Sequence, residues 1–202
     1  MVSGGGRIDH DIILDLVPMG AKVLDLGCGD GSLLEKLVRT KDVRGSGIEI
    51  SDEGVRACIG KGLAVMQGDI DLGLAEWPDR SFDYVILNQT LQAVRKPEVV
   101  LREMLRVGRK AVAGFPNFAY WKLRAYLLLR GRMPKTKFLP YEWYDTPNIH
   151  FCSVRDFDEY CESHGVRVER RIYISNDAEG RVLKGVLPNL FAETAVYLLA
   201  GE

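Results

Sequence analysis

The hydrophobic positions of this chain fall into short apolar runs that alternate with segments of helical spacing. A short apolar run bounded by turn residues predicts a buried strand, and apolar residues three or four positions apart predict an amphipathic helix. The strands expected on this basis cover residues 21–26, 43–50, 63–67, 82–88 and 111–115, and the helices cover 7–17, 32–38, 52–59 and 97–105. Regular alternation of strand and helix is typical of α/β proteins with a mostly parallel sheet.

The second half of the chain departs from this alternation. Residues 118–129 are strongly apolar and predict a helix that ends at Gly131, followed by a loop over 133–149. Ser153 is placed to cap a further helix, which Gly165 closes. The remaining expectations are a basic turn at 106–110, a strand at 166–174, a turn-rich loop at 176–180 and a last strand at 193–200.

Composition narrows the class of protein. The chain has 202 residues, of which 47% are hydrophobic and 27% are charged, and its net charge is −1. These values suit one α/β domain over residues 1–202, and they give no global attraction to nucleic acid. No apolar run reaches the roughly 18 residues that a membrane-spanning helix needs, and the first residues lack the pattern of a signal peptide. We therefore expect a cytoplasmic protein with neither a membrane nor a nucleic acid as its partner.

The four cysteines and three histidines do not suggest a metal site. No C-x-x-C pair is present, and no histidine lies at metal-ligand spacing from another ligand. Reduced thiols are expected. Cys28 lies inside a glycine turn at the start of a helix, where it could be a reactive thiol or, as the preferred interpretation, a small residue that fits beside a ligand.

That glycine turn is the most informative stretch of the sequence. Residues 23–31 read VLDLGCGDG, so a strand leads into glycines at every second position, with Asp25 two residues ahead of the first glycine. The dinucleotide fingerprint would need its third glycine at position 32, which is Ser32. An acid beside the turn suits a cationic ligand and would repel a pyrophosphate. The spelling resembles motif I of the class I S-adenosylmethionine-dependent methyltransferases.

Two further acids follow strands at the spacing that a nucleoside site requires. Glu49 ends the second strand, 18 residues after Gly31, where a carboxylate can accept hydrogen bonds from both ribose hydroxyls. The alternative is a surface glutamate at a strand end. Asp69 follows the third strand, and the resemblance places it at the acceptor for the adenine amino group. A turn aspartate that hydrogen-bonds its own backbone is the alternative there.

Over nearly its whole length the chain resembles the methionine biosynthesis protein MetW family. The most specific stretches are 23–31, 85–94, 101–109, 115–118 and 139–150. The resemblance implies a three-layer, Rossmann-like class I methyltransferase fold, whose seven-stranded sheet is mostly parallel with one antiparallel strand. It also implies S-adenosylmethionine or S-adenosylhomocysteine as cofactor and a homoserine O-acyltransferase as partner. The residues expected to bind the cofactor are Asp25, Gly27, Cys28, Gly29, Gly31, Glu49, Ile50, Asp69, Ile70, Asn88 and Gln89.

The sequence does not identify a catalytic residue. Amino-group methyltransferases often carry an Asn/Asp-Pro-Pro-aromatic motif after the fourth strand, whereas residues 88–91 here read NQTL. No acid or histidine in that stretch could act as a base. Tyr144, Asp145 and His150 remain as candidates for contacts to an acceptor. One hypothesis is therefore a cofactor-binding regulator of the acyltransferase, and the other is an authentic methyltransferase that acts on an unidentified small molecule.

Residues 118–149 allow several interpretations. No Asp or Glu occurs from Met104 to Tyr141, a stretch that holds nine basic residues. The segment could be a lid over the cofactor site, an apolar core helix with a solvated charged face, or a surface for docking another protein. RNA binding is disfavoured because the net charge is slightly negative and basic runs are usually solvated.

Overall fold

A computed structural model describes residues 7–136, 139–175, 181–183 and 187–200. Its centre is a sheet with the strand order β3-β2-β1-β4-β5-β8-β6-β7. The strands are β1 (Lys22–Leu26), β2 (Arg44–Glu49), β3 (Ala64–Gln67), β4 (Phe82–Asn88), β5 (Gly108–Pro116), β6 (Arg167–Ser175), β7 (Arg181–Val182) and β8 (Thr194–Ala200). The helices are α1 (Ile8–Leu16), α2 (Ser32–Lys41), α3 (Asp52–Gly60), α4 (Pro97–Val107), α5 (Trp121–Arg130), α6 (Val154–Ser163), α7 (Pro188–Phe191) and the 3-10 helix η1 (Ile70–Leu72).

The sheet confirms the expected fold class. Strands β1 to β5 are parallel to one another, and β8 runs antiparallel to both of its neighbours, β5 and β6. The two-residue strand β7 extends the edge beyond the seven longer strands. β7, η1 and α7 were not predicted, because elements of two to four residues are too short to show a hydrophobic period.

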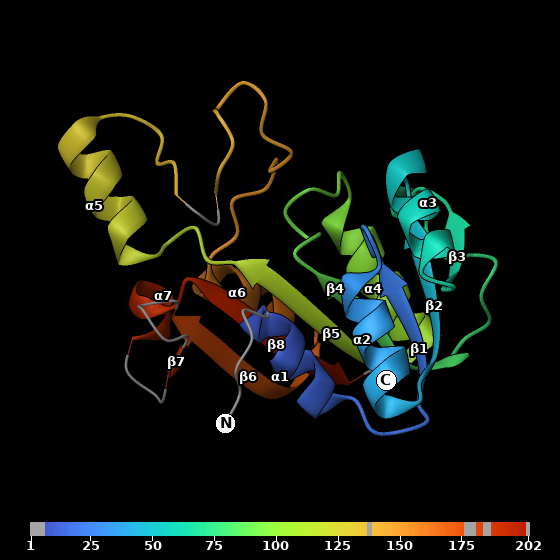
Figure 1. The fold of residues 1–202 in the computed structure, drawn as a ribbon. Helices are drawn as coiled ribbons and strands as arrows, with labels where there is room; N and C mark the ends of the chain where they lie inside the picture. Colours follow the sequence, from blue (N-terminus) through green and yellow to red (C-terminus); the bar gives the residue numbers. More distant parts are fainter. Residues whose placement is uncertain (1–6, 137–138, 176–180, 184–186, 201–202) are drawn as a thin grey trace.

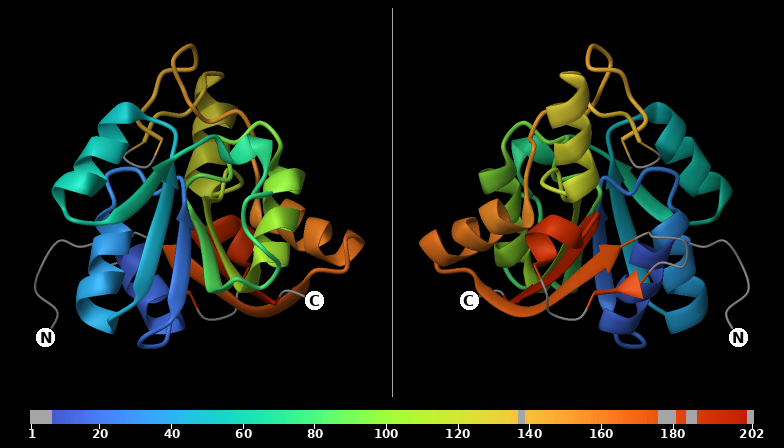
Figure 2. Two further views of the ribbon diagram at one scale, coloured as in Figure 1. Left: turned by 90° about the vertical axis from the view of Figure 1, so that its right-hand side faces the viewer. Right: turned by 90° about the vertical axis from the view of Figure 1, so that its left-hand side faces the viewer.

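Helices cover both faces of the sheet, with α1, α2 and α3 on one side and α4 and α6 on the other (Figure 2). Each side has its own cluster of buried apolar residues. Strand β4 lies between the two clusters, and its Val85, Ile86 and Leu87 are fully buried. A continuous apolar run was the signal for this strand, and burial on both faces explains it.

The predicted helix ends are confirmed where a cap defines them. The Ser51 hydroxyl accepts a hydrogen bond from the Gly54 amide at 3.1 Å. Ser153 and Asp156 form a reciprocal capping box at the start of α6. Gly131 follows α5 with a φ of 60°, which is the left-handed conformation that glycine adopts at low cost.

Two local predictions were wrong. The expected basic turn at 106–110 does not form, because α4 continues to Val107 and β5 begins at the next residue. Arg106 stays helical while its guanidinium bonds the Glu103 carboxylate at 2.8 Å and the Leu74 carbonyl at 3.0 Å. The helix expected from residue 118 begins only at Trp121. The turn that precedes it is held by the Asn117 side chain, which accepts a hydrogen bond from the Ala119 amide at 3.1 Å.

Helix α5 and the loop that follows it extend beyond the carboxyl ends of the parallel strands (Figure 1). Leu123 is the one residue of α5 that is buried, and it packs in a small cluster with Tyr120 and Leu139. The interpretation of this segment as a core helix is therefore wrong for most of its apolar residues. Within the described ranges, no helix has the length and apolar character that crossing a membrane would require.

Candidate functional site

The turn between β1 and α2 takes its shape from three glycines. Gly27, Gly29 and Gly31 have φ values of 66°, 57° and 75°, which other residues adopt only with strain. The amides of Gly27 and Cys28 donate to the Ile48 carbonyl at 2.8 and 3.1 Å, so the turn is fixed against β2. A Cβ added to Gly29 would meet no atom within 4 Å, which leaves open space at the middle of the turn.

Glu49 is buried at the carboxyl end of β2 and belongs to the same turn. One carboxylate oxygen accepts a hydrogen bond from the Gly29 amide and the other accepts from the Ser51 amide, both at 2.9 Å. A Cβ on Gly54 would lie 2.7 Å from the Glu49 side chain, so this glycine makes room for the acid. Glu49 is therefore not a solvated surface residue, and its carboxylate lies against the glycine turn.

Asp25, on β1, is the least satisfied carboxylate of the site. Asp25 is only 2% exposed, and its Oδ2 has no hydrogen-bond partner among the described residues. Burial raises the pKa of Asp25 to about 7, repulsion from Glu49 adds to this rise, and the Arg7 charge opposes it. A buried carboxylate without a partner is costly, and a cationic ligand would remove that cost.

These features fit the nucleoside that the glycine motif implies. The unpartnered Asp25 suits an amino group, the Glu49 carboxylate suits hydroxyl donors, and the open turn at Gly29 admits a ligand close to the backbone. Ile50 follows Glu49 and is exposed, as an apolar residue would be beside an adenine ring. Ile70, the first residue of η1, is buried.

Asp69 serves as a local cap in this structure. Its Oδ1 accepts a hydrogen bond from the Asp71 amide at 2.9 Å at the start of η1, and its Oδ2 lies 3.6 Å from the Arg95 guanidinium. One oxygen of Asp69, Oδ1, therefore behaves as the alternative interpretation expects of a turn aspartate that hydrogen-bonds the neighbouring backbone. The turn is adjacent to Glu49, since the Gly68 amide donates to the Glu49 carbonyl at 3.0 Å.

Asn88, the last residue of β4, and Gln89, the next residue, contact a different part of the molecule. The Asn88 side-chain amide donates to the Asp9 carboxylate of α1 at 2.8 Å. The Gln89 backbone has a φ of 58°, and its amide donates to the Gly114 carbonyl at 2.7 Å. Thr90, which the sequence analysis did not select, contacts the glycine turn instead: a Cβ on Gly27 would lie 2.6 Å from its methyl group.

A cavity of about 570 Å³ lies beside Gln89 and Asp9. Its lining includes Arg7, Asp9, Gln89, Gln92, Asn148 and Thr194. Burial tends to raise the pKa of Asp9, but hydrogen bonds from Arg7 and Asn88 outweigh it, and the pKa lies below its ordinary value. The cavity is therefore lined by a charged carboxylate and by amide side chains, which suits a small polar molecule.

The three candidates for acceptor contacts lie in the loop after α5. Tyr144, Asp145 and His150 are all exposed. The Asp145 carboxylate accepts a hydrogen bond from the Glu142 amide at 2.8 Å, which closes a turn. The His150 amide donates to the Gln92 carbonyl at 3.0 Å. Tyr141 lines the 570 Å³ cavity, and these three residues are not part of that lining.

Cys28 does not have the environment of a reactive thiol. Burial raises its pKa above the ordinary value, and the nearby Asp25 adds to the effect. Its sulfur lies 3.8 Å from that of Cys58, and both thiols are free. The interpretation as a small residue packed at the turn is the one that this environment favours. The described residues hold no cluster of three or more potential metal ligands.

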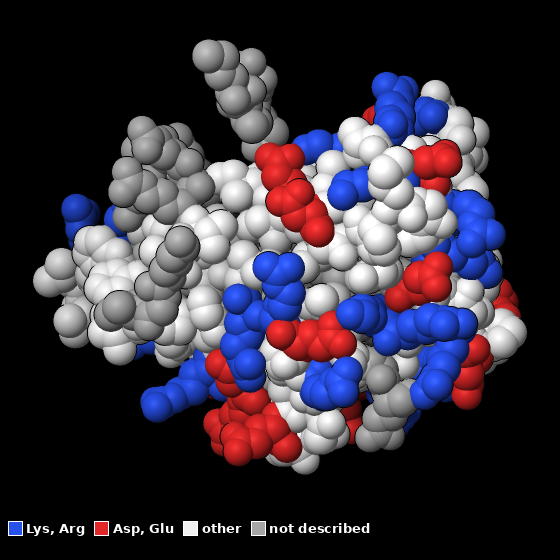
Figure 3. Space-filling model, turned by 90° about the horizontal axis from the view of Figure 1, so that it is seen from below, with Lys and Arg blue, Asp and Glu red and all other residues white. Residues whose placement is uncertain are grey.

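Charges of both signs are mixed on the underside of the molecule, at the amino ends of the parallel strands. Figure 3 shows lysines and arginines beside aspartates and glutamates, separated by areas of uncharged residues. Ion pairs of the chain include Lys36 with Asp11 and Lys110 with Glu169. This face offers no broad surface of one charge to a nucleic acid.

The sequence profile of the methionine biosynthesis protein MetW family matches residues 7–199. The chain belongs to the MetW family. It is 38% identical over 199 residues to the bifunctional methionine biosynthesis protein MetXA/MetW of Rhodopirellula baltica. That alignment covers 94% of this chain and 32% of the relative, so the chain spans about a third of the relative's length.

Solved structures share the fold at low sequence identity. An S-adenosylmethionine-dependent methyltransferase from Mesorhizobium loti superposes with a TM-score of 0.69 and 15% identity, covering 96% of this chain and 98% of that one. The [4+2]-cyclase SpnF superposes with a TM-score of 0.66 and 15% identity, covering 96% and 80%. The chain is therefore a member of the MetW family with the fold of the class I methyltransferases. Because a cyclase shares the fold, the fold alone does not assign methyl transfer.

Proposed function

We propose that the chain binds S-adenosylmethionine or S-adenosylhomocysteine at the carboxyl ends of β1, β2 and β3. The observation that carries this proposal is the buried Asp25 carboxylate, whose Oδ2 has no partner in the described structure beside an open glycine turn. The amino group of the ligand pairs with Asp25, and the ribose hydroxyls donate to Glu49. Ile50 and Ile70 contact the adenine, and Asp69 accepts from its amino group.

The remaining site residues frame the ligand. Gly27, Cys28, Gly29 and Gly31 form the wall of the turn, Gln89 lines the 570 Å³ cavity, and Asn88 donates to Asp9 of that lining. When bound, S-adenosylmethionine supplies a sulfonium whose methyl group an acceptor could displace. The contribution of this chain to such a step would be to orient the reactants, and positioning provides much of the rate of a displacement.

In this proposal the chain supports a homoserine O-acyltransferase. The support is the relative from Rhodopirellula baltica, a bifunctional MetXA/MetW protein. Fusion of two proteins into one polypeptide raises the effective concentration of each for the other, which favours pairs that work together. A cofactor-bound state that has a different affinity for the partner would report the supply of the methylation cofactor to methionine synthesis.

Two measurements test the proposal. Calorimetric titration of the purified chain with S-adenosylmethionine and with S-adenosylhomocysteine tests the site, and saturable binding of either is expected. Acyltransferase activity is then measured with and without the chain, at zero and saturating cofactor. A change in activity that depends on the chain is expected, and identical rates in all four mixtures would contradict the regulatory role.

A second candidate function is methyl transfer to a small polar molecule. The observation that favours it is the 570 Å³ cavity beside Gln89, with the Asp9 carboxylate in its lining. Incubation of the chain with methyl-labelled S-adenosylmethionine and a metabolite extract would release S-adenosylhomocysteine and a labelled product. If no product carried label while the chain still bound the cofactor, methyl transfer would be rejected, and the regulatory role would be the one remaining proposal.

A further inference from the structure

Helix α5 and the loop after it present an apolar surface that nothing in the described chain covers. Leu128 and Leu129 are 84% and 79% exposed, and Trp143 of the loop is 75% exposed. Soluble proteins rarely expose neighbouring large apolar side chains in this number unless another molecule covers them. The exposed apolar residues of this surface, called the α5 surface below, are Trp121, Tyr126, Leu127, Leu128, Leu129, Met133, Tyr141, Trp143 and Tyr144.

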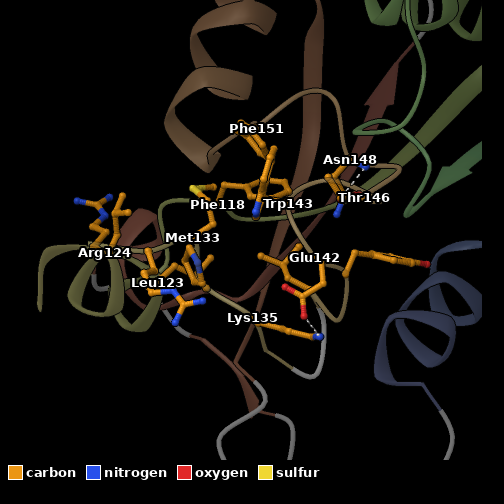
Figure 4. Close-up of a pocket in the computed structure, with 15 residues that line it drawn as sticks. Phe118, Leu123, Arg124, Met133, Lys135, Glu142, Trp143, Thr146, Asn148 and Phe151 are labelled. Carbon is orange, nitrogen blue, oxygen red and sulfur yellow. Dashed lines mark hydrogen bonds and ion pairs between the residues drawn. The ribbon is translucent and has the colours of Figure 1, made fainter. Parts of the chain in front are cut away.

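The α5 surface is a built feature and not a frayed end. A cavity of about 500 Å³ lies between α5 and the loop, and Figure 4 shows Phe118, Met133, Trp143 and Phe151 around it. The rings of Phe118 and Phe151 meet edge to face with centroids 5.0 Å apart, and Lys135 pairs with Glu142 at 2.6 Å. A partner would therefore meet an apolar groove with its own supporting contacts, and beside it the exposed Leu128 and Leu129 of the same helix, which lie outside the lining of the groove.

Charge narrows the kind of partner. Residues 118–136 contain five basic residues and no acid, and the loop that completes the α5 surface adds Asp145 and Glu142, the latter paired with Lys135. Arg130 directly follows the three leucines, Arg132 comes two residues later, and both are exposed. An apolar centre with arginines around it is typical of protein interfaces, and its complement is an apolar patch bordered by acids.

We propose that the α5 surface is where the chain docks onto the homoserine O-acyltransferase, against an acid-bordered apolar patch of that enzyme. This inference rests on the proposed function, which names the partner. The fused relative from Rhodopirellula baltica is the reason to choose this occupant over a second copy of the chain or a membrane.

The geometry also connects the α5 surface to the cofactor site. The amides of Ile149 and His150, at the end of the loop, donate to the Gln92 carbonyl at 2.8 and 3.0 Å. The Gln92 side chain donates in turn to the Gln89 carbonyl at 2.8 Å. These bonds join the end of the loop to the turn after β4, which holds Gln89 of the proposed cofactor site.

The test compares two double variants in binding to the purified acyltransferase from the same genome. Leu128→Ser with Leu129→Ser removes apolar groups from the α5 surface. Met19→Ser with Ile59→Ser is the matched control, because these residues are 73% and 62% exposed and lie away from α5. All four positions are exposed, so neither variant should unfold the chain, and circular dichroism and S-adenosylhomocysteine binding are measured for both.

The proposal predicts that the α5 variant binds the acyltransferase at least tenfold more weakly than the wild type, while the control binds as the wild type does. The double variant Arg130→Glu with Arg132→Glu should also bind the acyltransferase more weakly than the wild type, and this loss should be larger at low salt than at high salt. Equal binding by the wild type and the α5 variant would overturn the docking surface but leave the partnership standing. If the α5 variant lost self-association while its acyltransferase binding stayed unchanged, the docking proposal would be overturned, and the α5 surface would be an interface between two copies of the chain. No binding by the wild type would contradict the proposed partnership itself.

Discussion

The Glu49 carboxylate accepts a hydrogen bond from the Gly29 amide at 2.9 Å, which joins the end of β2 to the glycine turn of β1. The bond orders both halves of the candidate site before any ligand arrives. The second oxygen of the Glu49 carboxylate accepts a hydrogen bond from the Ser51 amide, so the carboxylate has little freedom to turn. Preorganisation of this kind lowers the cost of ordering a site on binding.

The Glu49→Gln variant should bind S-adenosylhomocysteine about tenfold to a hundredfold more weakly. The carboxylate can accept from two hydroxyls, and the loss of charge-assisted hydrogen bonds costs about 1.5–3 kcal/mol. Calorimetry at constant pH measures the change. Glu53→Gln is the matched control, because Glu53 is exposed on the first turn of α3. Unchanged affinity in the Glu49 variant would remove this residue from the site.

The Asp25→Asn variant should be more stable than the wild type at pH 8 in the absence of ligand. The pKa of Asp25 is about 7 in the folded chain, whereas the ordinary pKa of an aspartate is 3.8. Between these values the folded state keeps a proton that the unfolded chain has released, so the free energy of unfolding falls as the pH rises. About three pH units at 1.36 kcal/mol each set an upper scale of about 4 kcal/mol.

Urea unfolding at several pH values checks this prediction. The difference in unfolding free energy between variant and wild type should be small near pH 4 and should grow up to about pH 7, because the variant side chain does not titrate. A wild type that is as stable as the variant at pH 8 would mean that Asp25 has a partner or solvent that compensates its charge.

Cofactor affinity should rise with pH through the pKa of Asp25. The amino group of the ligand pairs only with the ionised carboxylate, so binding below about pH 7 must first remove the proton. Titrations between pH 5.5 and pH 7.5 should show affinity that increases with pH in the wild type. The Asp25→Asn variant should bind weakly and with little dependence on pH over the same range. A flat profile in the wild type would place the amino group away from Asp25.

Gly114→Ala should destabilise the chain, because a Cβ at this position would lie 2.1 Å from the Asn88 side-chain oxygen. Asn88 would have to move and give up its hydrogen bond to Asp9, so a loss of about 1–3 kcal/mol is expected. Thermal unfolding measures it. Gly60→Ala is the control: no atom lies within 4 Å of its Cβ, and it should be neutral or slightly stabilising. An unchanged melting temperature for Gly114→Ala would contradict the tight packing at Asn88.

The local parts of the site could be predicted from sequence because they depend on neighbours in the chain. Glycines at every second position after an apolar run indicated the turn, and Gly27, Gly29 and Gly31 all have positive φ. Glu49 could be predicted from its place at a strand end, since parallel strands of an α/β sheet end at one edge.

Other contacts could not be predicted, because they join distant residues. Asn88 and Asp9 are 79 positions apart, and no local pattern pairs them. The packing of Thr90 against Gly27 likewise depends on how β4 lies beside β1.

The exposure of α5 could not be predicted from its hydrophobicity either. Leu127, Leu128 and Leu129 are consecutive, so on a helix they point in three different directions and cannot all face one core. The sequence showed an apolar helix, and only the arrangement of the chain showed which of its sides is uncovered.

The most direct test is a crystal structure of the chain grown with S-adenosylhomocysteine. The account predicts that the amino group of the ligand lies within hydrogen-bond distance of the Asp25 carboxylate and that the ribose hydroxyls donate to Glu49. A ligand bound elsewhere on the chain, or an empty glycine turn in crystals that hold the compound at saturating concentration, would contradict it.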